Sequence, residues 1–107
     1  MPKIIHVGLR IPSIHPANIK QTQRFVVEAE TLGFHSIWAG DHVFHKVDVL
    51  DPLTLLGWIS GLTTNIRLGT SILLAAYRNP VLLAKTTASL DYISDGRLTL
   101  GMSLGGH

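Results

Sequence analysis

The side chains of this sequence that could carry acid–base chemistry are adjacent, at Asp41 and His42. Histidine titrates near neutral pH, and a neighbouring carboxylate can orient its ring or stabilise its charged form. The pair could therefore act as a general acid or base. An aspartate that caps a turn beside a partly exposed histidine explains the same two residues, and the residue types alone do not decide between these interpretations.

A metal site is a second possibility at this place, because Asp41, His42, His45 and Asp48 lie within eight positions. Their spacing matches neither the helical His-Glu-x-x-His pattern nor the His-rich arrangements of binuclear hydrolases. We therefore expect no metal ligands in the chain. The remaining histidines in apolar or Pro-flanked segments are expected to be structural: His6, His15 and His35.

A ligand could also approach the run Thr70, Ser71 and Ile72, which follows Gly69 in an apolar segment. A glycine inside a strand often marks a bulge or a close approach of the backbone by a ligand, although an ordinary strand glycine fits equally well.

Two other carboxylates, Glu28 and Glu30, are two positions apart. On a helix they point to different sides, so we expect both to be solvated.

Four apolar segments that read as strands set the positions of these residues. They cover residues 4–11, 35–39, 66–74 and 97–103, and each begins 31 residues after the one before. Three of them show little alternation of apolar and polar residues, which is typical of strands covered by helices. The sequence therefore predicts a repeated strand–helix unit in a parallel sheet.

Helix signals fill the intervals between these segments. An apolar stripe spans Ile19 to Leu32, and Gly33 can end that helix with a positive φ. The dipeptides Asp51-Pro52 and Asn79-Pro80 each place a capping side chain before a proline at the first helical position. The second and third helices therefore begin at equivalent places and run to about residues 62 and 90.

Right-handed crossovers make four such units curl in one direction, as in a (β/α)₈ barrel. Eight units and about 250 residues complete that fold. The expected fold class is therefore α/β, namely the N-terminal part, with about four strands and three helices, of a TIM barrel, forming one partial domain over residues 1–107. A flavodoxin-like sheet is the alternative, but Arg10-Ile11-Pro12-Ser13 stands where its Gly-rich loop would be.

Composition excludes several classes of function. The 107 residues are 46% apolar and 15% charged, they contain no cysteine, and their formal net charge is +2. A thiolate site and a cysteine nucleophile are thus impossible, and the scattered basic residues do not predict nucleic-acid binding. Neither a membrane span nor a signal peptide is recognisable, so a cytoplasmic protein is expected.

Several ordered blocks give the sequence a resemblance to the luciferase-like monooxygenase family. They are Glu30-Thr-Leu-Gly-Phe-His-Ser-Ile-Trp-Ala-Gly-Asp-His, Asp51-Pro-Leu-Thr-Leu-Leu, Arg67-Leu-Gly-Thr-Ser-Ile-Leu, Asn79-Pro-Val-Leu-Leu-Ala-Lys and Leu90-Asp-Tyr-Ile-Ser-Asp-Gly-Arg-Leu-Thr-Leu-Gly. The resemblance runs through nearly the whole chain. It implies a barrel enzyme that transfers hydride or activates oxygen on a small organic substrate, with FMN or the deazaflavin coenzyme F-420 as cofactor.

The resemblance also implies roles for individual residues. The family's Trp-x-x-Asp/Glu-His motif falls on Trp38, Asp41 and His42, which makes His42 the proton donor or acceptor and Asp41 the residue that orients it or contacts substrate or cofactor. In many deazaflavin-dependent members a bulge with a non-prolyl cis peptide supports the cofactor ring. The matching bond is Ser71–Ile72, and with Thr70 these residues are the expected cofactor contacts.

Two departures from the family limit what the chain could do alone. Gly106 stands where some deazaflavin-dependent members carry an acidic residue, and the later loops that hold the cofactor phosphate have no counterpart in the chain. We therefore expect weak cofactor binding or none by this chain in isolation. The competing hypothesis is non-enzymatic: a half barrel with two open edges and an exposed apolar interior that self-associates, and in either case we expect a homo-oligomer.

Overall fold

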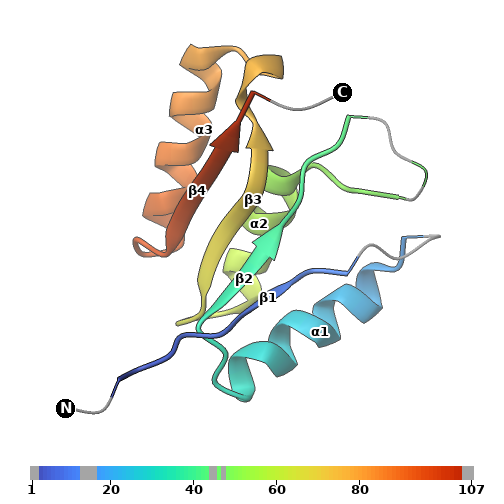
Figure 1. Cartoon of the computed structure of the whole chain (residues 1–107), viewed down its shortest axis with the longest axis vertical. Helices are drawn as coiled ribbons and strands as arrows, with labels where there is room; N and C mark the ends of the chain where they lie inside the picture. Colours follow the sequence, from blue (N-terminus) through green and yellow to red (C-terminus); the bar gives the residue numbers. More distant parts are fainter. Residues whose placement is uncertain (1–2, 13–16, 44–45, 47, 105–107) are drawn as a thin grey trace.

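The computed structural model describes residues 3–12, 17–43, 46 and 48–104. Four parallel strands form one sheet in the order β1-β2-β3-β4, and a helix connects each strand to the next (Figure 1). The elements are β1 (Gly8–Arg10), α1 (Ile19–Thr31), β2 (Ser36–Ala39), α2 (Pro52–Leu62), β3 (Arg67–Leu74), the 3-10 turn η1 (Ala75–Tyr77), α3 (Pro80–Ile93) and β4 (Leu98–Ser103). The expected α/β class and parallel sheet are confirmed.

The predicted helix signals act where the sequence places them. The Asp51 carboxylate accepts a hydrogen bond from the Thr54 N–H at 2.9 Å, and Pro52 follows it as the first residue of α2. Asn79 caps α3 in the same way, with Pro80 at its start. Gly33 follows α1 with a φ of +85°, which a residue with a side chain rarely adopts.

The first strand is much shorter than predicted. Instead of residues 4–11 it covers Gly8–Arg10, and Ile4 and Ile5 are 81% and 82% exposed. β1 pairs only with β2 among the described strands. Its pairing with the chain leading into β2 reaches back to the Val7 carbonyl, which accepts from the His35 N–H at 2.9 Å, so the apolar residues Ile4 and Ile5 lie before the sheet. The other three strands begin within one residue of their predicted starts.

The register of the sheet sorts its side chains into two faces. Apolar side chains in register with one another face the helices and belong to the core: Leu9, Ile37, Leu68 and Leu98. The next row lies on the opposite, open face: Arg10, Trp38, Gly69 and Thr99. Alternation along the strands points the more apolar set of side chains to the helices. The open face, which corresponds to the expected barrel interior, therefore carries polar and apolar groups together, with Arg10 and Thr99 beside Trp38.

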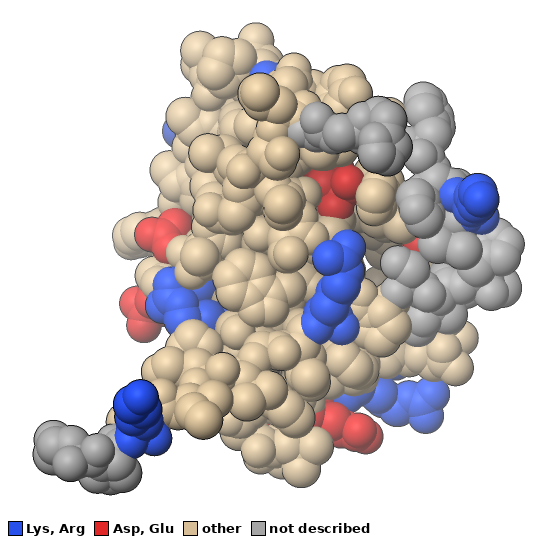
Figure 2. Space-filling view, viewed as in Figure 1, with Lys and Arg blue, Asp and Glu red and all other residues tan. Residues whose placement is uncertain are grey.

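Trp38 fills the space that Gly69 leaves on this face. A Cβ at Gly69 would collide with the indole ring of Trp38, whose Nε1–H donates to the Ser36 hydroxyl at 2.9 Å. The glycine in β3 thus accommodates a side chain of the neighbouring strand. Figure 2 shows basic side chains at separate places on this side of the molecule, with no basic patch.

A buried arginine, Arg97, links the amino ends of β3 and β4. Arg97, just before β4, is 8% exposed, and its guanidinium donates to the carbonyls of Ser94 (2.6 Å), Ser60 (3.0 Å), Ile66 (3.1 Å) and Thr63 (3.2 Å), and to the Thr63 hydroxyl (2.7 Å). The carbonyls of Ser60 and Thr63 belong to the end of α2, where helical hydrogen bonding stops. One side chain therefore ties the end of α2 to the starts of β3 and β4.

The carboxylate of Glu30 also stabilises this end of the sheet, so the expectation that Glu30 is solvated was wrong. Glu30, at the end of α1, accepts hydrogen bonds from the N–H groups of Thr64 (2.8 Å), Asn65 (2.7 Å) and Ile66 (3.0 Å). Partial burial acts to raise the pKa of Glu30, but these three bonds and the charge of Arg97 outweigh it and hold the pKa below its ordinary value. Glu30 is thus a link between α1 and the chain leading into β3.

Among the described residues, no helix is long and apolar enough to cross a membrane.

We expect Arg97→Met to lower the free energy of unfolding by about 3 kcal/mol or more, because several buried carbonyls lose their donor. Urea denaturation measures the loss. Arg24→Met is the matched control: Arg24 is exposed on α1, and its replacement should change stability by less than about 0.5 kcal/mol. Equal effects of the two substitutions would contradict a fastening role for Arg97.

We expect the contribution of Glu30 to stability to vanish in acid. A carboxyl whose pKa is lower in the folded than in the unfolded chain stabilises the fold above its unfolded pKa, and this stabilisation is lost as the pH falls through the folded pKa. Glu30→Gln should therefore cost about 1–2 kcal/mol at pH 7 and almost nothing near pH 3. Urea denaturation of both proteins at several pH values tests this, and Glu28→Gln, on the exposed side of α1, should show no such trend.

Candidate functional site

β3 carries a bulge near its carboxyl end. Thr70 pairs with Leu100 and Leu73 with Met102, so two residues of β3, Ser71 and Ile72, stand opposite one residue of β4. The Ser71–Ile72 peptide bond is cis, as the family resemblance predicted. The bulge turns Ile72 outward, where its side chain is 46% exposed, whereas Leu73 returns to the core.

Thr70 occupies a different position from its two neighbours. It is fully buried in the sheet, its hydroxyl donates to the Gly101 carbonyl at 2.9 Å, and it accepts from the Gly101 N–H at 3.0 Å. Both functions of the hydroxyl are thus used to hold β4 beside the bulge. Of the three residues expected to contact a cofactor, Ser71 and Ile72 lie at the open end of the sheet, whereas Thr70 is buried in it.

Asp41, which follows β2, contacts the last residue of β3 and Arg78, which lies between η1 and α3. Its Oδ2 atom accepts from the Leu74 N–H and from the Arg78 guanidinium, each at 2.9 Å, and its side chain is 7% exposed. Arg78 also donates to Asp51 at 2.9 Å. The Asp41 carboxylate therefore holds the end of β3 directly after the bulge, and Arg78 links it to the cap of α2.

Charge reinforces this cluster. Partial burial acts to raise the pKa of Asp51, but hydrogen bonds from Thr54 and Arg78 outweigh it and hold the pKa below its ordinary value. Burial acts to lower the pKa of Arg78, and hydrogen bonds to Asp41 and Asp51 outweigh it and raise the pKa. Arg78 is therefore a permanent cation between two carboxylates.

Arg10 approaches the same bulge from β1. Its Nη1 donates to the Ser71 carbonyl at 2.9 Å, and its guanidinium lies against Gly40, where a Cβ would collide with it. Residues at the ends of β1 and β2 thus both contact β3 near the bulge. Arg10 binds the carbonyl of the cis peptide itself, and Asp41, which follows β2, binds the N–H of Leu74 after it.

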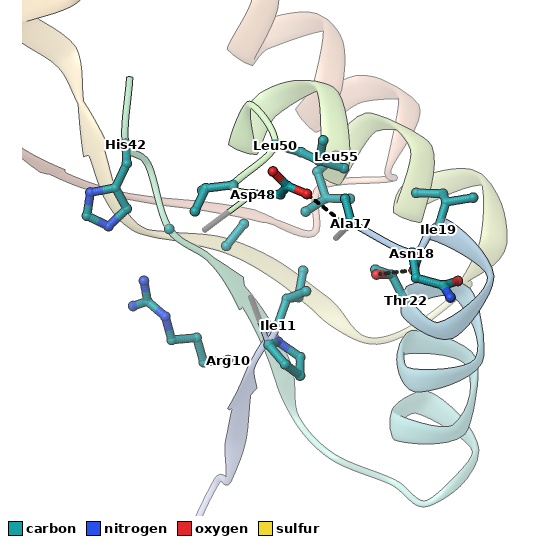
Figure 3. Close-up of a pocket in the computed structure, with 14 residues that line it drawn as sticks. Arg10, Ile11, Ala17, Asn18, Ile19, Thr22, His42, Asp48, Leu50 and Leu55 are labelled. Carbon is teal, nitrogen blue, oxygen red and sulfur yellow. Dashed lines mark hydrogen bonds between the residues drawn. The ribbon is translucent and has the colours of Figure 1, made fainter. Parts of the chain in front are cut away.

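His42 is exposed at the carboxyl end of β2 and borders a cavity of about 260 Å³. The cavity lies between the ends of β1 and β2 and the start of α1; Arg10, Ile11, Asn18, Gly40 and Leu55 also line it (Figure 3). In Figure 3 the side chains of Arg10 and His42 extend toward one another at its rim. An imidazole there can exchange a proton with a ligand bound over the open end of the sheet.

The structure brings together His42, Asp41, Ser71 and Ile72 at one edge of the sheet. Among the residues that the structure describes, no group of three or more His, Asp or Glu side chains could hold a metal ion. His15 and His45 lie outside the described residues, as does Gly106, the residue at which the chain departs from some deazaflavin-dependent members. His6 and His35 stack with ring centroids 4.1 Å apart, close to the amino ends of β1 and β2.

Sequence reasoning missed Arg10 and Arg78. Both are single basic residues without a motif, and their importance comes from partners 61 and 37 positions away, Ser71 and Asp41. Their positions in the sequence could have pointed to them: Arg10 ends the first strand, and Arg78 precedes the Asn-Pro start of the third helix.

Comparison with known proteins decides the family. Residues 5–107 match the family model of the luciferase-like monooxygenases. The chain belongs to this family. With a solved member in complex with FMN, the oxygenating constituent of 3,6-diketocamphane monooxygenase from Pseudomonas putida, it shares the fold with a TM-score of 0.85 at 24% identity, over 97% of this chain and 30% of that one. The chain matches the N-terminal third of such TIM barrels.

Relatives of this luciferase-like chain use two kinds of cofactor. It is 37% identical over 86 residues to the F420-dependent glucose-6-phosphate dehydrogenase of Kineococcus radiotolerans, covering 76% of this chain and 26% of that protein. It is 32% identical over 80 residues to the oxygenase component of the flavin-dependent trigonelline monooxygenase of Acinetobacter baylyi, covering 74% and 22%. The chain thus spans about a quarter of the curated relatives it matches.

We expect Asp41→Ala to expose the Leu74 amide to solvent exchange, because that N–H loses its acceptor. Hydrogen–deuterium exchange at Leu74 should accelerate at least tenfold. Asp51→Ala is the matched control, since it also removes a partner of Arg78 but leaves Leu74 hydrogen-bonded. Equal exchange of Leu74 in the two variants would mean that Asp41 does not hold the end of β3.

Proposed function

We propose that this chain contributes His42, at the open end of the sheet, to the active site of a flavin- or deazaflavin-dependent oxidoreductase that acts on a small organic substrate. The observation that carries the proposal is the bulge of β3, placed at the same edge of the sheet as His42 and contacted by Arg10 and Asp41 from the two preceding strands. Carboxyl ends of barrel strands are where active sites form in this fold.

The residues at the bulge fit a flat, largely apolar ring. Ile72 presents a branched apolar side chain toward solvent at a strand position where its neighbours Leu73 and Thr70 are fully buried. Such a surface gains stability when an aromatic ring covers it. Ser71 and Ile72 would thus form the backing of the ring, and a bound flavin or deazaflavin would supply hydride transfer or, for flavin, oxygen activation.

His42 and Asp41 take different parts in this proposal. His42, exposed at the rim, donates or accepts the proton that accompanies the redox step. Asp41, paired with Arg78 and Leu74, is a positioning residue that fixes the end of β2 against β3. Of the two roles that the sequence left open for Asp41, these contacts favour positioning.

Absorption spectroscopy tests the proposal on the protein expressed with all the sequence that its gene encodes on either side of this chain. Titration with FMN and with coenzyme F-420 should give saturable spectral changes for one of them. The chain of residues 1–107 alone should bind either one at least a hundredfold more weakly, since barrel phosphate sites lie in later loops. Absence of saturation by both cofactors in the longer protein would refute the proposed function.

We expect His42→Asn to slow turnover of that protein by about 10²- to 10⁴-fold while its cofactor affinity stays within about threefold. The reason is that asparagine fills similar space but exchanges no proton near neutral pH. Steady-state kinetics and the same titration measure the two effects. His6→Asn, exposed before β1, is the control and should leave both unchanged; a His42→Asn protein with full turnover would exclude the proton-transfer role.

A second candidate function, self-association, is favoured by the sheet edges. β1 and β4 each have one strand neighbour among the described strands, and Met102 and Leu104 at the end of β4 are 57% and 85% exposed. Sedimentation of the chain alone distinguishes the candidates: a stable dimer that binds no cofactor supports self-association, and a monomer excludes it.

A further inference from the structure

Arg10 is a cation on the open face of the sheet, and no described carboxylate pairs with it. The structure gives its guanidinium one hydrogen bond, to the Ser71 carbonyl, and no carboxylate partner among the described residues. Asp41, two residues after β2, is already paired with Arg78, which also holds Asp51. Asp48, which lines the same cavity as Arg10, accepts a hydrogen bond from the Ala17 N–H at 2.6 Å. A guanidinium has five N–H donors, so Arg10 keeps donors for a ligand.

The position of Arg10 is fixed by its surroundings. Its Nη1 is held 2.9 Å from the Ser71 carbonyl, and the surface beneath it is Gly40, whose Cβ would collide with the guanidinium if another residue stood there. The guanidinium is therefore set in place before a ligand arrives, which reduces the entropy that binding costs. It lies at the rim of the cavity, and it extends toward His42 (Figure 3).

We propose that Arg10 binds the carboxylate of an acidic organic substrate and so presents that substrate to His42. This inference rests on the proposed function, because it assigns a substrate class to the same site. A single guanidinium matches one singly charged carboxylate in shape and charge. A phosphate dianion would call for a second cation, and the other described arginine at this end of the sheet, Arg78, is occupied by two carboxylates.

The sheet provides a matched control on the same face. Arg67, at the start of β3, also lies on the open face, but at the amino end, where it donates to the Thr99 hydroxyl at 3.0 Å and to the Leu98 carbonyl. An effect of general positive charge would be the same for both arginines. A built carboxylate site would depend on Arg10 alone.

The test is a nuclear magnetic resonance titration of the ¹⁵N-labelled full chain with acetate and, separately, with inorganic phosphate, at constant ionic strength. We expect acetate to shift the Gly40 and Ser71 amides in a saturable manner. Arg10→Gln should raise the acetate Kd at least tenfold, Arg10→Lys should raise it less, and Arg67→Gln should leave it within threefold. The dispersion of the same spectra shows whether each variant is folded.

Three results would overturn the proposal: no saturation by acetate up to 100 mM in the unchanged chain, equal effects of Arg10→Gln and Arg67→Gln, or phosphate binding more tightly than acetate. The FMN and coenzyme F-420 titrations test the proposed function separately. Arg10-dependent acetate binding without cofactor binding would leave the carboxylate site standing and refute the oxidoreductase, whereas the reverse result would refute only the site.

Discussion

The structure depends on one constraint, the parallel pairing of four strands in chain order. Right-handed connections then place every helix on one face, and every strand ends at the same edge. Apolar side chains in alternate positions, such as Ile37 and Leu68, must point to the helices, and their neighbours Trp38 and Gly69 must point away. The separation of a packed face from an open face follows from this pairing.

The two ends of the sheet have different tasks. At the amino end, Arg97 and Glu30 satisfy backbone groups at the end of α2 and the start of β3, and these contacts serve stability. At the carboxyl end, Arg10 and Asp41 contact the bulge of β3 and leave His42 at the rim. This division follows the general behaviour of the barrel fold, in which the amino face maintains stability and the carboxyl face carries the chemistry.

Asp41 shows why adjacent residues in sequence can have separate tasks. Side chains that follow one another at a strand end diverge, so the carboxylate of Asp41 turns inward to Leu74 and Arg78 while His42 stays exposed. A carboxylate that is 7% exposed and holds two donors is well suited to fixing backbone. The same contact joins the segment after β2 to the end of β3, beyond the last paired residues of the two strands and beside the bulge in the β3–β4 ladder.

The sequence by itself determined the elements and their order, because the signals involved are local. Helix starts at Asp51-Pro52 and Asn79-Pro80 act over three or four residues, and the 31-residue interval reports strand, helix and strand in one unit. The length of β1 could not be read in this way, since it depends on where the chain meets its partner β2 in space.

Only the tertiary structure decided which groups the charged residues contact. Glu30, Arg97, Arg78 and Arg10 belong to no motif in the sequence, and each has at least one partner more than thirty positions away. Hydrogen bonds are short and directional, so their partners depend on how strands and helices meet in space. How the strands and helices meet follows from strand register and packing, which cannot be deduced from any short segment of the sequence.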